Sequence, residues 1–248
     1  SDFAGSTLVH ACGGAAALAG VIVLGAREGR FGSKGEKKSM VPFAASSIPL
    51  VTLGTFLLWF GWFGFNGFSQ LAMGTFDDVN AISKIAVNTH LAGAAGTVAG
   101  ATITRLMAGK TDIVMMLNGA LAGLVAITAE PLTPSPLLAI LIGFVGALIM
   151  YFGTKFLESL QLDDVVGAIP VHMFAGIFGT LVVPASNPGT NFGTQLLGVI
   201  SVCFFSFILS FIVFNAMKAT IGLRISKEAE KLGTDKAEVG VVAYSIRD

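Results

Sequence analysis

The stretch Asp2-Phe-Ala-Gly-Ser-Thr-Leu-Val-His10 decides the fold, because its pattern returns as Asp164-Val-Val-Gly-Ala-Ile-Pro-Val-His172. Both copies have an Asp, a Gly three residues later, a Val seven later and a His eight later. Each copy lies in a strongly apolar stretch, where an ionisable residue is costly and usually marks a pathway or a partner. The two copies therefore predict an internal repeat that brings His10 and His172 into one site.

The composition predicts a membrane protein. The chain has 248 residues, of which 54% are hydrophobic and 12% charged, and its mean hydropathy is +0.79. Soluble domains carry about 25% charged residues, so this chain has too little charge to cover a globular surface in water. Its net charge of zero gives no reason to expect nucleic-acid binding. Cys12 and Cys203 lie in apolar stretches, so we expect buried thiols rather than a disulfide or a metal site.

Seven segments are long and apolar enough to cross a bilayer, since a span needs roughly 17–25 mostly apolar residues. They are residues 5–26, 43–68, 84–108, 113–130, 135–155, 166–185 and 195–220. Polar or Gly/Pro-rich breaks separate them, and a polar tail covers residues 221–248. We therefore expect an all-α transmembrane helix bundle over residues 1–220, followed by a cytoplasmic tail.

The basic residues predict the orientation. Fourteen of the fifteen Lys and Arg residues fall on one side of the predicted spans, and only Lys84 falls on the other. The positive-inside rule makes that side cytoplasmic, which predicts a multi-pass protein of the cell membrane whose first span enters from outside and whose C-terminus is cytoplasmic. Span 5–26 then runs inward and span 166–185 outward. Such an inverted-topology repeat is typical of transporters, with the site near the midplane.

Paired imidazoles offer a specific chemistry. A neutral imidazole has one hydrogen-bond donor and one acceptor, and a dry, apolar surrounding disfavours its charged form. His10 and His172 could therefore pass a small hydrogen-bonding molecule or relay a proton, or they could be structural residues that bridge two helices. Asp2 and Asp164 stand where helix-capping residues stand, and Asp2 could also attract cations to the outer entrance.

The segment from Trp59 to Ser69 holds both tryptophans of the chain. Aromatic faces attract cations, and the Ser69 hydroxyl could accept a hydrogen bond from an ammonium-like donor. The composition alone favours an interfacial aromatic belt instead. His90 has no partner in the repeat, so we expect a structural or interfacial role for it.

Four glycines form small-xxx-small pairs, Gly96 with Gly100 and Gly119 with Gly123. Such pairs favour close helix packing or subunit contact.

These residues resemble the ammonium transporter family (Amt/Mep/Rh). Residues 2–27, with Asp2-Phe3-Ala4-Gly5-Ser6, Gly13-Gly14 and Arg27, resemble the family's fifth span. Gly61-Trp62-Phe63-Gly64-Phe65-Asn66 resembles its sixth span, and Asp164, Gly167, Val171-His172, Ala175-Gly176 and Gly179 resemble its tenth. The similarity runs the whole length of the chain. It implies a homotrimer of bundles, each with its own narrow hydrophobic pore, lined by two hydrogen-bonded histidines that His10 and His172 match.

The resemblance implies further roles. Ser69 matches a residue of the outer ammonium site, Thr128 a residue close to the pore, and Asp2 an acidic residue that supports ammonium recruitment. The other residues with implied pore or substrate roles are Trp62, Phe65 and Asn66. The tail over 233–244 resembles a cytoplasmic segment that couples subunits and can meet a PII-type regulator. Because the family has eleven spans and this chain matches the last seven, we expect a fragment of a longer protein, with the inverted repeat only partly represented.

The function expected is passage of ammonium or ammonia through a hydrophobic pore lined by the histidine pair, without enzymatic activity or a cofactor. Two alternatives stay open. One is an ammonium-binding sensor without flux, and the other is a membrane electron carrier with haem between two histidines, which uses the same residues. The sequence does not decide between movement of NH3 and net movement of NH4+.

Overall fold

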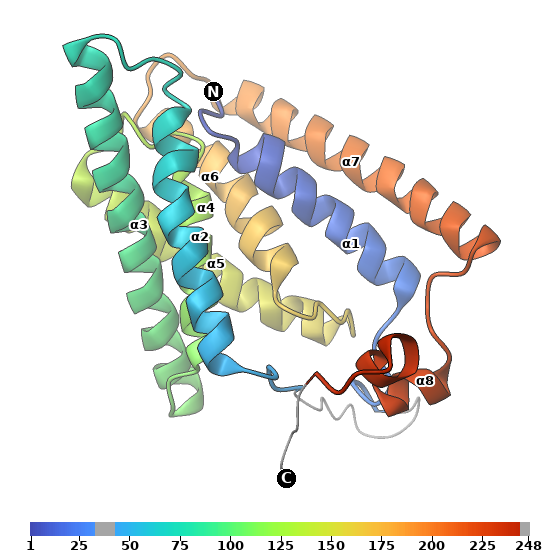
Figure 1. The fold of residues 1–248 in the computed structure, drawn as a ribbon. Coiled ribbons are helices and arrows are strands. Elements are labelled where there is room, and N and C mark those ends of the chain that lie inside the picture. Colours follow the sequence, from blue (N-terminus) through green and yellow to red (C-terminus); the bar gives the residue numbers. More distant parts are fainter. Residues whose placement is uncertain (33–42, 244–248) are drawn as a thin grey trace.

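A computed structural model describes residues 1–32 and 43–243 (Figure 1). These residues form a bundle of helices, which confirms the predicted all-α fold class. Some residues used in the topology and tail predictions lie outside the described residues; they are Lys34, Lys37, Lys38, Tyr244 and Arg247.

Seven α-helices build the bundle. They are α1 (Cys12–Leu24), α2 (Ile48–Phe68), α3 (Phe76–Ala108), α4 (Ile113–Ile127), α5 (Pro136–Ser159), α6 (Ala175–Val182) and α7 (Phe192–Thr220). Two π-helical turns, η1 (Ser6–Ala11) and η2 (Ile169–Phe174), lead directly into α1 and α6. A 3-10 turn, η3 (Val183–Ala185), extends α6, and the tail carries α8 (Lys227–Leu232) and the π-helical turn η4 (Asp235–Val239).

Capping side chains fix where the helices begin. Ser47, Asp112 and Ser135 each accept a hydrogen bond from the backbone N–H three residues later, at the starts of α2, α4 and α5. Thr75 and Asp78 form a reciprocal capping box at the start of α3. That box explains why α3 begins at Phe76, ahead of the predicted membrane span that starts at residue 84.

Some of the predicted spans form helices that are long and apolar enough to cross a membrane, and others form shorter helices. Four helical segments are long and apolar enough to cross a membrane: Ser6–Leu24, Ile48–Phe68, Pro136–Ser159 and Phe192–Thr220. Ile113–Ile127 and Ile169–Ala185 are shorter apolar helices. The 33-residue α3 is long enough to cross, but its first turns carry charged and amide side chains. That all seven segments cross the bilayer stays a prediction.

Helix α4 forms the core of the bundle, and every residue from Gly119 to Ile127 is buried. Glycines let its backbone touch that of α3. A β-carbon added to Gly119 would lie 2.5 Å from the carbonyl oxygen of Gly96, and one added to Gly96 would collide with the carbonyl of Gly119. The small-residue spacing in these helices therefore serves close packing within the chain.

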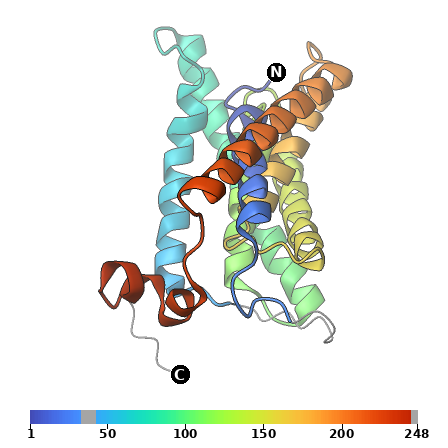
Figure 2. The same cartoon turned by 90° about the vertical axis from the view of Figure 1, so that its right-hand side faces the viewer.

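The two repeat copies run in opposite directions. In Figure 1, α1 descends from the N-terminus, whereas α6 rises toward the loop that leads into α7. Figure 2 shows α7 crossing in front of α1, and Ser206 of α7 donates a hydrogen bond to the carbonyl of Cys12 at 2.8 Å. The tail helix α8 lies near the end of α1, where Glu230 accepts a hydrogen bond from the backbone N–H of Glu28 at 2.7 Å.

Candidate functional site: a histidine pair at the crossing of two half-repeats

Each histidine of the repeat lies on a π-helical turn, His10 on η1 and His172 on η2. π-helical turns occur frequently at functional sites. A glycine with positive φ precedes each turn, Gly5 at 108° and Gly167 at 75°. The matched Gly of the sequence motif thus supplies a backbone conformation that other residues adopt only with strain.

The matched aspartates cap these turns. Asp2 accepts hydrogen bonds from the backbone N–H groups of Thr7 and Leu8, the latter at 2.8 Å. Asp164 accepts from Ala168 at 2.9 Å and Ile169 at 2.7 Å. Burial raises the pKa of both carboxyls, and the backbone hydrogen bonds oppose that rise.

The capping positions differ by one residue for a simple reason. Pro170 stands where the first copy has Leu8, and proline has no backbone N–H to donate. Asp164 therefore binds N–H groups one position earlier in the repeat than Asp2 does.

A pair of glycines that the sequence argument did not single out as a repeat pair lets the two turns cross. Gly14 and Gly176 each lie four residues beyond a motif histidine. A β-carbon on Gly14 would lie 2.6 Å from the backbone nitrogen of Met173, and one on Gly176 would lie 3.2 Å from the backbone nitrogen of Ala11. Ala11 and Met173 each directly follow a motif histidine, so the contacts are equivalent. The sequence signal for this glycine pair is the extension of the repeat by four residues beyond each histidine.

The crossing brings the two imidazoles together. The Nδ1 atoms of His10 and His172 lie 3.2 Å apart, and the rings stack with centroids 5.3 Å apart and planes 15° apart. One Nδ1–H donates to the other Nδ1, and the tautomers decide which ring is the donor. In a neutral pair the donor ring then has a bare Nε2, and the acceptor ring has a protonated Nε2. The pair thus offers one hydrogen-bond acceptor and one donor on its outer edges.

This arrangement does not suit haem ligation. Metal–imidazole bonds are about 2 Å long, so an iron between two ligating nitrogens needs them about 4 Å apart and facing the metal. Here the Nδ1 atoms are bonded to each other at 3.2 Å, which leaves the Nε2 atoms on opposite edges of the pair. Among the described residues, no three His, Cys, Asp or Glu side chains are grouped to hold a metal ion.

Trp62 supports the His10 ring from α2. The two rings stack with centroids 4.9 Å apart and planes 13° apart. The indole Nε1–H donates to Thr128 Oγ1 at 2.9 Å, and Thr128 Oγ1 donates to the Leu124 carbonyl at 2.7 Å. All of these groups are buried, so the hydrogen bonds fix the orientation of the indole behind His10.

The other predicted residues of α2 lie at different depths. The Phe65 ring lies 5.5 Å from that of His10. Asn66 is fully buried, donates to Thr89 Oγ1 at 3.0 Å and leaves its Oδ1 without a hydrogen-bond partner. Ser69 is half-buried and its hydroxyl donates to the Phe65 carbonyl at 2.8 Å, so this hydroxyl is turned back to its own helix.

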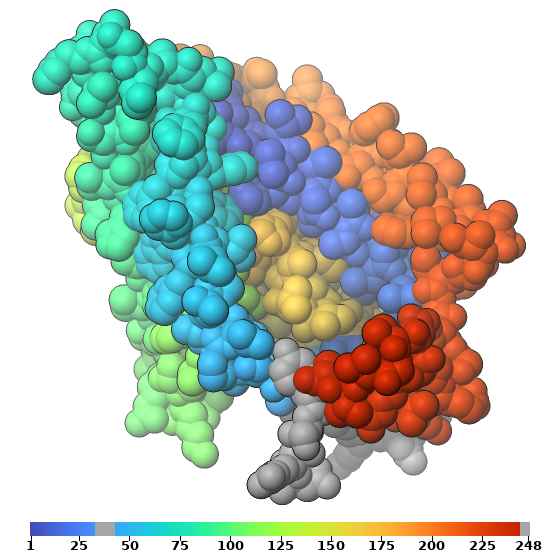
Figure 3. All heavy atoms as spheres, viewed as in Figure 1, coloured from blue at the N-terminus to red at the C-terminus, as the bar shows by residue number. Residues whose placement is uncertain are grey.

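A pocket of about 240 Å³ lies beside the histidine pair, and its lining residues come from both repeat copies. They are Val9, His10, Gly13, Gly14, Ala168 and His172. Figure 3 shows the molecule hollowed between α1 and α2, over the η2–α6 segment. The Nε2 atom of His10 is buried without a hydrogen-bond partner, which is unusual for a buried polar atom.

His90 lies apart from the pair, as its lack of a repeat partner suggested. Its ring lies 5.5 Å from that of Trp59 and 6.2 Å from that of Phe63, between α2 and α3.

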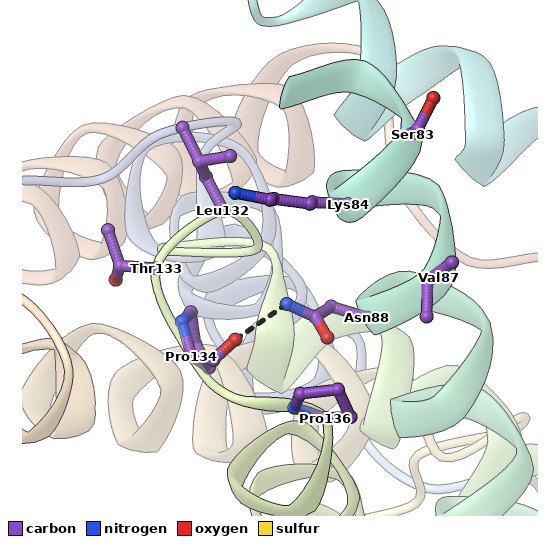
Figure 4. A pocket seen from close by; sticks show the side chains of 8 residues that line it. All are labelled: Ser83, Lys84, Val87, Asn88, Leu132, Thr133, Pro134 and Pro136. Carbon is purple, nitrogen blue, oxygen red and sulfur yellow. Dashed lines mark hydrogen bonds between the residues drawn. The ribbon is translucent and has the colours of Figure 1, made fainter. Parts of the chain in front are cut away.

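A second and larger pocket of about 400 Å³ lies between α3 and the loop that enters α5 (Figure 4). Lys84 points across this pocket, and Asn88 donates hydrogen bonds to the carbonyls of Pro131 and Pro134 that hold the loop in place. The histidines do not line it.

Ion pairs join the segment that follows α1 to Asp163, the residue before the second copy. Arg27 donates to Asp163 through Nε at 2.7 Å and through Nη2 at 2.9 Å, and Arg30 Nε lies 3.5 Å from the same carboxylate. The Asp163 side chain is only 2% exposed. Burial favours a higher pKa for Asp163, but the hydrogen bonds from Arg27 and the charges of both arginines hold the pKa below its ordinary value.

The sequence matches one family over almost its whole length. The model described as the Ammonium Transporter Family matches residues 1–244. The chain belongs to the ammonium transporter family. It is 41% identical to Ammonium transporter Amt2 of Archaeoglobus fulgidus, over 98% of this chain and 55% of that protein. It is 37% identical to Ammonium transporter Amt1 of Haloferax mediterranei, over 98% of this chain and 49% of that protein.

Solved structures agree with this family. The fold matches a Sensor Amt Protein with a TM-score of 0.86 and 35% identity, over 96% of this chain and 60% of that one. It matches Candida albicans Mep2 with a TM-score of 0.79 and 30% identity, over 96% of this chain and 55% of that one. The chain thus spans about half the length of the family members that it matches.

Proposed function

We propose that the full-length protein moves ammonium across the cell membrane, through a pathway in which His10 and His172 are the central polar groups. The observation that carries this proposal is the contact between two imidazoles delivered by oppositely directed half-repeats, 3.2 Å apart at Nδ1. Relatives named as ammonium transporters support the substrate.

The local chemistry suits ammonia better than a hydrated cation. The edges of the histidine pair offer one donor and one acceptor, and ammonia can both accept and donate a hydrogen bond. The neighbouring groups are Trp62, Phe65 and small or aliphatic residues, so a metal ion that lost its water there would gain little in return. Ammonium differs because it can transfer a proton to water at the entrance and continue as neutral ammonia.

We assign roles to the surrounding residues from their contacts and from the family resemblance. Trp62 and Thr128 hold the His10 ring, and Phe65 lies beside that ring on the approach from α2. Asn66 supports this part of α2 from inside the bundle through its hydrogen bond to Thr89. The family resemblance assigns Ser69 to the outer ammonium site. Asp2 and Asp164 cap the half-repeats, and Asp2 also favours cations at the entrance. The basic residues on one side of the spans support a cytoplasmic C-terminus. A homotrimer and a PII-type regulator at the tail complete the proposal; the resemblance of the tail to the family's cytoplasmic segment supports the regulator.

The test is uptake of labelled methylammonium and ammonium-driven current by the full-length protein in proteoliposomes. We compare the wild type with His10→Ala and His172→Ala. Each substitution removes one half of the pair, so we expect a change in flux of at least about tenfold or a loss of discrimination against other monovalent cations. Unchanged flux, selectivity and charge transfer in both variants would contradict a histidine-lined route. Binding of ammonium by the wild type without any flux would favour the sensor alternative.

A further inference from the structure

Both motif loops are held against α4, but by different means. In the first copy the backbone of the loop makes the contacts, just past the end of α4: Phe3 N–H donates to the Ala129 carbonyl at 2.7 Å, and Ala4 N–H donates to the Thr128 carbonyl at 3.0 Å. Ser6, at the start of η1, adds a side-chain hydrogen bond to the Val125 carbonyl of α4 at 2.6 Å. In the second copy a side chain makes the contact: Asn118 Nδ2 donates to the Val166 carbonyl at 3.0 Å. Ala4 and Val166 are both the second residue after the motif aspartate, so the two contacts occupy equivalent positions.

The difference follows from where each loop meets α4. The last carbonyls of a helix lack intrahelical partners, so the end of α4 can accept hydrogen bonds from a passing backbone. Asn118 lies within α4, where the backbone groups are already paired along the helix. At this position only a side chain of α4 can hydrogen-bond to the loop, and the Asn amide supplies an N–H donor.

Within the second loop the Asp164 carboxylate binds backbone N–H groups, but the valine side chains of the loop pack weakly. Val165 and Val166 are 62% and 67% exposed, so packing of their side chains contributes little to their placement. Gly167 follows, with a φ of 75°, and a β-carbon there would lie 2.8 Å from Asn118 Nδ2. The glycine therefore also makes room for the amide. From Gly167 the chain enters η2, since the Gly167 carbonyl accepts a hydrogen bond from Val171 N–H at 3.2 Å, one residue before His172.

We infer that Asn118 is the positioning residue of the His172 half of the site, and that its amide replaces the backbone contacts that hold the His10 half. The inference rests on the proposed function only for its transport readout. Asn118 acts through the backbone rather than on the imidazoles; it fixes the loop from which η2 starts, and so the angle at which His172 meets His10.

The experiment uses the full-length protein with Asn118→Ala and Asn118→Asp. Asp has the size of Asn but no N–H, and its carboxylate would face a carbonyl oxygen. The control is Asn215→Asp, because Asn215 Nδ2 donates at 2.8 Å to the Phe211 carbonyl of its own helix, α7. The readouts are the methylammonium flux, its pH profile, and the ¹⁵N spectrum of the paired imidazoles, which reports their tautomers.

We expect both Asn118 variants to lower the flux by roughly three- to tenfold, to shift its pH profile and to change the imidazole spectrum, whereas Asn215→Asp leaves all three unchanged. If neither Asn118 variant accumulates, Asn118→Gln and Asn118→Met make the same comparison, since they have similar length and only Gln has a donor. Gln should then resemble the wild type more closely than Met does.

Two results are distinguishable. If the wild type transports and the donor-less variants keep its pH profile and imidazole spectrum, the role of Asn118 is wrong while the proposed function stands. If the wild type shows no flux, the proposed function fails, and the imidazole spectrum still decides whether Asn118 positions His172.

Discussion

The two copies of the motif, residues 2–11 and 164–173, agree in what places the imidazoles and differ in what surrounds them. Each has a capping Asp, a Gly with positive φ, a π-helical turn and a histidine. The His10 ring has Trp62 and Phe65 beside it, whereas among the described residues the ring contacts of His172 are confined to His10. Backbone symmetry therefore sets the meeting point, and the aromatic side chains of α2 give the two rings different environments.

Substitutions of Gly14 and Gly176, where the two copies cross, should have the largest effect on this backbone symmetry. Gly14→Ala and Gly176→Ala each place a β-carbon against the main chain of the other copy, which cannot rotate away. Overpacking of this kind typically costs about 1–3 kcal/mol, so we expect a clear loss of thermal stability in the purified full-length protein, of similar size for both.

The control for that comparison is Gly198→Ala on α7, where an added β-carbon meets no described atom within 4 Å. Alanine is favoured over glycine inside a helix by about 0.5–1 kcal/mol, so this variant should keep or gain stability. A destabilised Gly176→Ala beside an unaffected Gly14→Ala would show that the two crossings are not equivalent.

The capping aspartates give a smaller effect and sharpen the comparison. Asp2→Asn and Asp164→Asn each keep one acceptor oxygen, but an amide NH2, which cannot accept a hydrogen bond, replaces the second carboxylate oxygen. We expect each to lower stability by about 1–2 kcal/mol, measured by thermal unfolding. If Asp2 also attracts cations at the entrance, methylammonium flux should fall further in Asp2→Asn than in Asp164→Asn. The reverse order would count against recruitment by Asp2.

The ion pairs of Asp163 with Arg27 and Arg30 give the smallest expected effect on stability, and this effect is lost only in acid. The pKa of Asp163 in the folded protein lies below its ordinary value of 3.8. Its contribution to stability is therefore fully present above pH 3.8 and is lost as the pH falls through the lower, folded pKa. Thermal unfolding of the wild type and of Asp163→Asn, measured from neutral pH into acid, isolates the contribution of Asp163 to stability, because all other carboxyls titrate in both proteins. The difference in stability between the wild type and Asp163→Asn should shrink in acid. A difference that grows in acid would refute the stabilising role of the ion pairs.

Much of the fold could be predicted from local sequence patterns. Apolar length located the helices, and the Asp, Gly and His spacing predicted a repeated segment that holds His10 and His172. Their contact required tertiary packing, which spacing alone does not give. Helix α3 extends beyond the predicted span 84–108, because the Thr75–Asp78 capping box starts the helix in polar sequence that hydropathy does not detect.

The parts of the site that the sequence argument missed depend on contacts between distant segments. Asn118 is one polar residue in an apolar helix, and its role is apparent only when Val166 lies beside it. The stacking of Trp62 on His10 likewise requires the crossing angle of α2, so its sequence context predicted an aromatic belt as readily as a ring support.

The hydrogen bond between the two Nδ1 atoms also gives the pair a direction. With a single shared proton, one outer nitrogen is basic and the other acidic, so the two ends are unlike at any moment. A proton that enters at the basic end and leaves at the acidic end moves the shared proton across and exchanges the tautomers of both rings. A second proton that arrives from the same side then meets an outer nitrogen that is already protonated. Conduction of successive protons would require the rings to restore their tautomers after each one, and the rate of that reset would limit the current.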